Sequence, residues 1–168
     1  MTSKEKTLDQ VVQDLQGLGP GDLQVVADAV DALQQAGIDQ HRFLIDFWGI
    51  SAAQEGPGRW IARMPIKPQV LNMLRIVHGG ATYTLADTVM GYAVWQQYQG
   101  QKACVTVEIK MTYIAPGRGR ELVAEVEVLR AGATLAYTDC RVRDDTGRLV
   151  ATASGTYYAW DPSQSLPD

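Results

Sequence analysis

The chain has 168 residues, of which 46% are hydrophobic and 20% are charged. This length and composition fit one ordinary domain with a packed core and exclude a disordered chain. Lys and Arg number 15 and Asp and Glu number 19, which gives a net charge of -4. That balance argues against nucleic acid or an anionic membrane as the main partner. No apolar run approaches the ~20 residues that span a bilayer.

The first residues, MTSKEKTLDQVVQDL, lack the apolar stretch of a signal peptide, so the sequence predicts a cytoplasmic chain. Two cysteines, Cys104 and Cys140, form no C-x-x-C motif, and two histidines, His41 and His78, lie far apart in the sequence. Two thiols do not make a disulfide framework, and these spacings do not match a zinc site. We therefore expect no bound metal.

Residues 1–40 are predicted to form a helical extension, because apolar residues recur there at helical spacing between glycine-rich breaks. Asp22 is the expected N-cap of a second helix, which we expect to end at Gly37. Two helices raise the question of a helix-turn-helix reader of DNA. The segment is acidic and would be repelled by phosphates, so we interpret it as packing on the main domain or on a partner subunit.

Residues 41–161 are predicted to form an α+β domain, followed by a loose tail over residues 162–168. Two strands are expected first, then a helix from Ala81 to about Gln99 that is apolar on more than one side and hence buried. Four more strands follow, and short connections favour an antiparallel meander that curls around the helix. The six predicted strands are Arg42–Ile50, Arg59–Ile66, Cys104–Tyr113, Glu121–Leu129, Thr134–Arg143 and Leu149–Trp160.

Two glycines, Gly79 and Gly80, stand where the loop becomes the long helix. The first N–H groups of a helix are unpaired and carry partial positive charge, which suits an oxyanion or a polarised carbonyl. Glycine also lets a ligand oxygen approach the backbone closely. The simpler alternative is that both glycines only permit a tight turn.

A carboxylate, Asp87, lies inside the apolar helix, where an unpaired charge is costly. In an apolar cleft such a group serves as a nucleophile or a general base. Alternatively, Asp87 faces solvent or pairs with Thr84 or Thr88. Upstream, His78 and Asn72 are candidates for the same site, or for loop and turn residues.

Gly79 and Asp87 are separated by ~12 Å along one helix, at ~1.5 Å per residue. That separation is too long for both groups to act on one carbonyl. If they do act on one substrate atom, Asp87 must come from a second copy of the helix that runs antiparallel. The pair then predicts a two-fold homodimer with two equivalent sites.

The segment His78–Gly91, HGGATYTLADTVMG, resembles the HGG…LAD…G signature of hotdog-fold acyl-CoA thioesterases. It is most similar to the PaaI-like, phenylacetate-pathway type and to the second 4-hydroxybenzoyl-CoA thioesterase type. The similarity runs from about Phe47 to Tyr157, includes Val105–Pro116, and leaves residues 1–40 outside. It implies a hotdog fold, in which an antiparallel sheet wraps around one long central helix.

The resemblance also implies roles for individual residues. The carboxylate at Asp87 attacks the thioester carbonyl or activates water, and the backbone N–H of Gly79 polarises that carbonyl. Asn72 and Thr106 match residues that orient the water or the thioester, and His78 supports the loop. Such enzymes need no metal or redox cofactor, and subunits share each site in a homodimer or homotetramer.

Coenzyme A carries phosphates, so a basic rim is expected. Arg118 and Arg120 are candidates for it, with Gly80 as a further substrate-binding candidate, although each arginine can equally be a solvated surface charge. The sequence departs from the family at Leu74, where members often carry glycine. The loop 72–77 is therefore bulkier and more apolar, and its aliphatic side chains become candidates to line an acyl pocket.

The sequence thus predicts hydrolysis of an acyl-CoA to a carboxylate and free CoA. One alternative is a non-catalytic hotdog module that senses acyl-CoA. Another is a hotdog dehydratase or hydratase, which pairs a histidine with a carboxylate; no second histidine has a suitable spacing here. The acyl group, dimer versus tetramer, the role of residues 1–40 and the choice between nucleophile and base for Asp87 all stay open.

Overall fold

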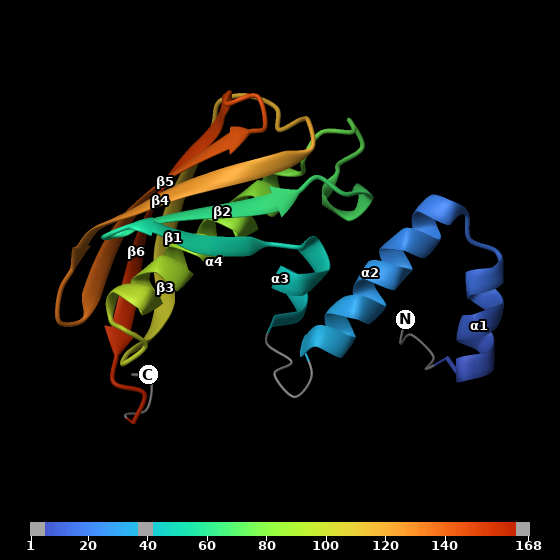
Figure 1. The fold of residues 1–168 in the computed structure, drawn as a ribbon, viewed down its shortest axis with the longest axis horizontal. Coiled ribbons are helices and arrows are strands. Elements are labelled where there is room, and N and C mark those ends of the chain that lie inside the picture. The colour runs from blue at the N-terminus through green and yellow to red at the C-terminus, as the bar shows by residue number, and fades with distance from the viewer. Residues whose placement is uncertain (1–5, 37–41, 164–168) are drawn as a thin grey trace. The chain divides into compact units, whose positions relative to one another are not determined.

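The computed structural model describes residues 6–36 and 42–163. The chain divides into two compact units, residues 1–47 and residues 48–168. Figure 1 shows helices in the first unit and, in the second, a sheet with one long helix. None of the described helices is long and apolar enough to cross a membrane.

The first unit contains α1 (Leu8–Gln16) and α2 (Pro20–Ala36). In α1, the Thr7 hydroxyl accepts from the backbone N–H of Gln10, and the Gln10 side chain accepts from the N–H of Thr7, which makes a capping box. The prediction that Asp22 caps the second helix is wrong, because α2 begins at Pro20 and places Asp22 within its first turn. Proline suits this start, since the first helical N–H has no intrahelical partner. The predicted end at Gly37 lies outside the described residues.

The strand predicted over Arg42–Ile50 is wrong, because Phe43–Trp48 form a helix, α3. The sequence places partners four residues apart, which suits a helix. The rings of Phe43 and Phe47 stack with centroids 5.5 Å apart, and Arg42 reaches Asp46 at 3.3 Å. Aromatic and branched residues favoured a strand, but these pairs form only on a helical face.

The second unit is built on one antiparallel six-stranded sheet in the order β1-β2-β4-β5-β6-β3. The long helix α4 (Gly79–Gln97) packs across it and contacts five of its strands. Five of the six predicted strands are present, as is the predicted long helix. The sixth strand of the sheet, Ser51–Gly56, was not predicted. The strands are β1 (Ser51–Gly56), β2 (Arg59–Pro65), β3 (Ala103–Tyr113), β4 (Glu121–Ala131), β5 (Leu135–Asp144) and β6 (Leu149–Trp160), with a short 3-10 helix, η2 (Pro68–Val70).

The expected meander is wrong for one strand, because β3 pairs with β6 rather than with β4. The helix α4 carries the chain from β2 to the far edge of the sheet, where β3 lies. Residues 114–120 then return along the strand ends: Ile114 bonds to Val150, and Ile66 bonds to Arg120. These backbone hydrogen bonds place β4 beside β2, so the return segment crosses β6 and β5 instead of making a hairpin.

The core lies between the sheet and one side of α4. Alternate residues of β2, β4, β5 and β6 point inward, as the buried Leu122, Ala124 and Val126 do on β4. Outside the buried stripe, α4 carries Tyr83, Tyr92 and Trp95, which are 36–42% exposed in the single chain. The helix is therefore buried on one side, rather than all round. A sheet wrapped over one long helix in this strand order is the hotdog fold.

Candidate active site

The start of α4 presents one free backbone donor. His78 is the N-cap, and its Nδ1 accepts a 2.9 Å hydrogen bond from the N–H of Gly80. The next N–H groups, of Ala81 and Thr82, bond to the carbonyl of His78. Among the described residues, the N–H of Gly79 has no hydrogen-bond acceptor. His78 thus consumes one of the helix's unpaired N–H groups and leaves that of Gly79 available to a ligand.

The last residue of β3 borders the same turn. The Tyr113 hydroxyl donates to the carbonyl of Gly79 at 2.8 Å, which ties the first residue of α4 to the sheet. Burial, with a smaller contribution from Tyr83, raises the pKa of Tyr113, so the hydroxyl keeps its proton at neutral pH. A Cβ at Gly79 would lie 3.4 Å from this ring, which is an ordinary contact. Packing within the chain therefore does not by itself require glycine here.

Asp87 lies two turns further along α4 and is half-buried. Its Oδ1 accepts from the Thr106 hydroxyl at 2.7 Å and from the Tyr157 hydroxyl at 3.2 Å. No hydrogen bond joins it to Thr84 or Thr88 among the described residues, so the pairing considered from sequence is replaced by partners from β3 and β6. The structure thus brings Thr106 and Asp87 together.

Asn72 uses its side-chain oxygen to hold its own loop. Oδ1 accepts from the N–H of Leu74 at 2.9 Å and of Ile76 at 3.4 Å. The backbone N–H of Asn72 also bonds to the carbonyl of Ile76. Arg75 has φ +55°, a conformation that few non-glycine residues adopt. The amide nitrogen of Asn72 has no hydrogen-bond partner among the described residues.

A pocket of about 320 Å³ opens beside Gly79, between this loop and the segment after β3. Its walls are mainly aliphatic and include Ile76 and Ile114. Leu74 does not line it and is 75% exposed. Asp87 and Thr106 do not line it either, so within one chain the free N–H and the carboxylate belong to separate places. The lining residues are Asn72, Ile76, Val77, Gly79, Thr82, Tyr113, Ile114, Ala115, Pro116, Gly117 and Val150.

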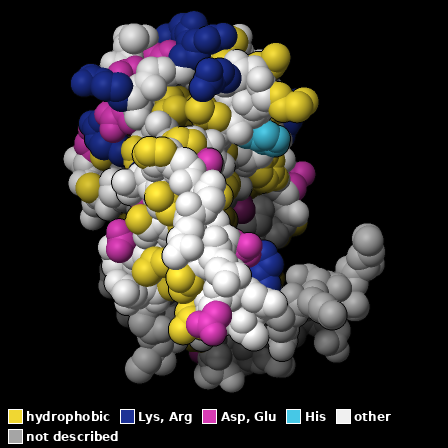
Figure 2. Space-filling model, turned by 90° about the vertical axis from the view of Figure 1, so that its right-hand side faces the viewer, with side chains coloured by type: hydrophobic (Ala, Val, Ile, Leu, Met, Phe, Trp, Pro, Cys, Tyr) yellow, Lys and Arg dark blue, Asp and Glu magenta, His cyan; other side chains and the backbone are white. Residues whose placement is uncertain are grey.

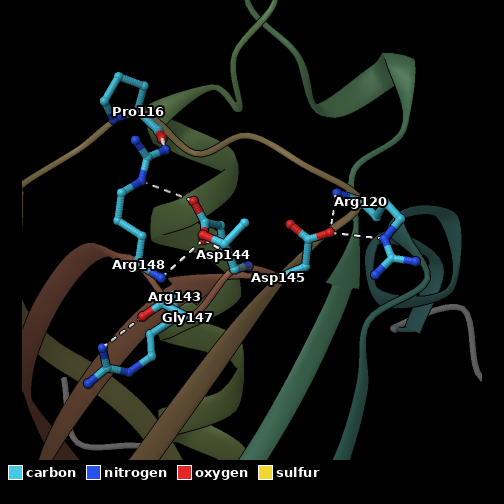
Figure 3. A network of polar contacts seen from close by, with 8 residues as sticks. Pro116, Arg120, Arg143, Asp144, Asp145, Gly147 and Arg148 are labelled. Carbon is cyan, nitrogen blue, oxygen red and sulfur yellow. Dashed lines mark hydrogen bonds and ion pairs between the residues drawn. The ribbon is translucent and has the colours of Figure 1, made fainter.

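The two candidate phosphate-binding arginines differ. Arg120 donates from Nε and from its backbone N–H to Oδ2 of Asp145, at 2.9 and 3.2 Å (Figure 3). This contact lowers the pKa of Asp145 and pairs the Arg120 guanidinium with a carboxylate. Arg118 is exposed and has no hydrogen bond or ion pair with any described residue. Figure 2 shows Lys and Arg gathered at the upper end of the view, with acidic side chains among them.

An ionic network around the buried Asp144, which sequence reasoning missed, holds one wall of the pocket (Figure 3). Asp144 accepts from Nε of Arg148 at 3.1 Å, and Nη2 of Arg148 donates to the carbonyl of Pro116 at 2.7 Å. The carbonyl of the neighbouring Gly117 accepts from the N–H of Val77 at 3.0 Å. In sequence, the only sign of this network is an aspartate in a turn, which occurs in many hairpins.

Tyr157 was also missed, because the alternation of β6 marks it only as one more inward-facing residue. No group of three or more His, Cys, Asp or Glu side chains that could hold a metal ion occurs among residues 6–36 and 42–163. The polar groups that the structure places in this region are a backbone donor, a carboxylate and hydroxyls.

A fold of this kind, with a free N–H at the start of its helix and a carboxylate within it, is typical of hotdog thioesterases. The model of the thioesterase superfamily matches residues 74–151. Acyl-coenzyme A thioesterase 13 of Homo sapiens is 31% identical over 111 residues, which are 65% of this chain and 79% of that protein. The chain belongs to the thioesterase superfamily, and it is a thioesterase.

Solved structures share this fold. The BH2602 protein from Bacillus halodurans, crystallised with CoA, is 30% identical, with a TM-score of 0.80, and the match covers 90% of this chain and 99% of that one. The PaaI protein of E. coli, from the phenylacetic acid degradation operon, is 24% identical with a TM-score of 0.65, covering 79% and 96% of the two chains. The PaaI likeness supports the fold alone.

Proposed function

We propose that this thioesterase hydrolyses an acyl-CoA to a carboxylate and free CoA, with Gly79 and Asp87 at the reacting centre. The observation that carries this proposal is the N–H of Gly79, which has no acceptor in the described chain and opens beside an aliphatic pocket. The human relative's name, acyl-coenzyme A thioesterase, and the CoA in the Bacillus structure support the choice of thioester.

In the proposed reaction, the thioester carbonyl oxygen accepts a hydrogen bond from the N–H of Gly79. The partial positive charge of the α4 N-terminus stabilises the negative charge that develops on that oxygen. His78 keeps the turn in shape by capping the helix. Ile76 and the other aliphatic wall residues receive the acyl group, which places its carbonyl at the glycine turn.

Asp87 acts on the carbonyl carbon either directly or through water. As a nucleophile, it forms an anhydride with the acyl group and expels the CoA thiolate, and water then hydrolyses the anhydride. As a general base, it takes a proton from the water that attacks the carbonyl carbon, and the thiolate leaves with a proton. Thr106 and the amide of Asn72 orient that water. No step in either route uses a metal or a redox cofactor.

The two groups meet only if a second copy of the chain supplies one of them. They lie ~12 Å apart on one helix, and the pocket beside Gly79 does not include Asp87. Tyr92 and Trp95, whose rings contact each other on α4 and which are 38% and 42% exposed, offer a surface that a second helix would cover. We therefore infer a homodimer with shared sites, on which a homotetramer can be built.

The CoA phosphates would meet Arg118 rather than Arg120. Arg118 is exposed and has no ion pair in the described chain, whereas Arg120 already shares its charge with Asp145. Gly80 has its N–H engaged by His78 and contributes only its lack of a side chain. The substrate-binding role of Gly80 is thus confined to access.

A thiol-release assay tests the proposal. The protein is given aromatic, short-chain and long-chain acyl-CoAs, beside Asp87→Ala as the matched variant. We expect turnover of at least one class and its loss in Asp87→Ala, with the fold retained by circular dichroism. Tight acyl-CoA binding in calorimetry without any thiol release would instead favour the sensor alternative.

A further inference from the structure

Tyr157 on β6 reaches Asp87 from beneath α4. Its side chain is 1% exposed, yet its hydroxyl lies 3.0 Å from the carbonyl oxygen of Asp87 and 3.2 Å from Oδ1. A buried tyrosine hydroxyl needs a partner, and this one takes two oxygens of a single residue. The contact fixes both the backbone and the side chain of Asp87 relative to the sheet.

The ring of Tyr157 occupies a space that glycines leave open on both sides. A Cβ at Gly155 would lie 3.0 Å from one ring edge, and a Cβ at Gly91 would lie 3.4 Å from the other. On the neighbouring strands, Tyr157 stands opposite Thr106 and Ala136. The ring is therefore held between helix and sheet with little room to turn, so its hydroxyl has one well-defined position.

The hydroxyl is a permanent donor. Burial, and then the negative charge of Asp87, raise the pKa of Tyr157 far above its ordinary value. The other titratable side chain close by is Cys104, and burial raises the pKa of that thiol as well. Both Tyr157 and Cys104 therefore stay protonated near neutral pH, and the Tyr157 hydroxyl keeps the proton that it donates to Asp87.

We propose that Tyr157 is a positioning residue for the Asp87 carboxylate. Together with Thr106 it holds Oδ1, which leaves Oδ2 as the oxygen that meets the substrate or the water. Oδ2 has no hydrogen-bond partner among the described residues. This inference rests on the proposed role of Asp87 and adds the residue that orients its carboxylate.

The test compares Tyr157→Phe with Tyr158→Phe in the full chain. Tyr158 is the next residue on β6, so the control removes the same hydroxyl group on the opposite face of the sheet. We expect Tyr157→Phe to lower kcat about tenfold, as for loss of one hydrogen bond to a charged group, with KM unchanged within about twofold. The acid limb of its kcat profile should move to higher pH, because the charged carboxylate has lost a donor. Tyr158→Phe should leave all three quantities unchanged.

Adding Thr106→Val to Tyr157→Phe gives a double-mutant cycle. Both side chains donate to Oδ1, so their effects on kcat should be non-additive. If Tyr157→Phe has the same kcat and pH profile as Tyr158→Phe, while Asp87→Ala is inactive, the positioning role of Tyr157 is overturned and the role of Asp87 stands. If Asp87→Ala itself keeps full activity, the proposed function fails first, and the two failures are thereby distinguished.

Discussion

The Thr106 hydroxyl donates a 2.7 Å hydrogen bond to Oδ1 of Asp87 across 19 residues of sequence. This contact links the strand at the edge of the sheet to the carboxylate within the helix. It exists because β3 crosses to the far edge and pairs with β6, a placement that a simple meander would not give. This strand order therefore brings the Thr106 and Tyr157 hydroxyls to the Asp87 carboxylate.

Thr106→Val should lower kcat about tenfold, because one charge-assisted hydrogen bond to the carboxylate is removed. Valine keeps the shape and the strand preference of threonine, so the fold should be retained. Thr112→Val, on the same strand but exposed, is the matched control. The kcat values of both variants are compared with wild type by steady-state kinetics on the acyl-CoA that the enzyme turns over fastest. Equal rates for the two variants would show that Thr106 does not serve Asp87.

Two substitutions at Asn72 separate its loop role from its proposed donor role. Asn72→Ala removes the acceptor for Leu74 and Ile76 and should cost about 1 kcal/mol of stability as well as activity. Asn72→Asp keeps an acceptor oxygen but loses the amide N–H, so it should restore the melting temperature and not kcat. Wild-type kcat in Asn72→Asp would mean that the amide donates nothing to the reaction.

Asp144 should make the free energy of unfolding decrease as the pH falls into the acid range. The Thr146 hydroxyl, followed by backbone N–H groups and Arg148, lowers the pKa of Asp144 below its ordinary value of 3.8. A lowered folded-state pKa contributes stability above the unfolded value, which is lost as pH falls through the folded value. Asp144→Asn sets the Asn nitrogen against Arg148 and should cost about 1–3 kcal/mol at pH 7.

Urea unfolding followed by tryptophan fluorescence at several pH values measures this effect. The gap in unfolding free energy between wild type and Asp144→Asn should narrow below about pH 4, where the carboxylate of the unfolded chain gains its proton, and shrink further as pH falls through the lower folded-state pKa. Asp139→Asn, on the exposed face of the same strand, should stay within about 0.5 kcal/mol of wild type throughout. A gap that stays constant with pH would mean that the charge of Asp144 contributes nothing.

Gly79 can be tested with two substitutions, of which only one removes its backbone N–H. Gly79 is the first residue of α4, a position where proline is well tolerated. His78 has φ -60° and ψ 136°, a conformation that the residue before a proline adopts readily. Gly79→Pro should therefore keep the helix and lose most of kcat, about 100-fold or more. Gly79→Ala adds a side-chain carbon and keeps the N–H, so it should retain much of the activity. Comparable losses in both would point to crowding rather than to a lost donor.

Sequence patterns predicted the local elements better than their pairing. Period-two alternation located β3 and β4, turn signals bounded β5 and β6, and the glycine turn located α4. The same patterns could not show that β3 lies beside β6, since that depends on backbone hydrogen bonds of residues 114–120. At Phe43–Trp48, residue types that favour strands formed a helix, because partners four residues apart pair only there.

At the site, the motif identified the backbone turn and the carboxylate, but not what holds them. The chain spacing of Gly79 and Asp87 was enough to show that one helix cannot bring them together. The sequence could not show that Tyr157 on β6 is a partner of Asp87, because an inward-facing tyrosine in an alternating strand has the same pattern as any core residue. Likewise, the Arg148 contact to Pro116 joins segments whose proximity no short pattern encodes.

The central claim, that Gly79 of one subunit and Asp87 of another form one site, is tested most directly by complementation. Gly79→Pro and Asp87→Ala chains are unfolded, mixed in equal amounts and refolded, and mixed dimers are counted by native mass spectrometry. Random pairing makes half of the dimers mixed, and each of these has one intact site, so about a quarter of wild-type thiol release should return. Mixed dimers that form in the expected amount but release no CoA thiol would contradict a shared site.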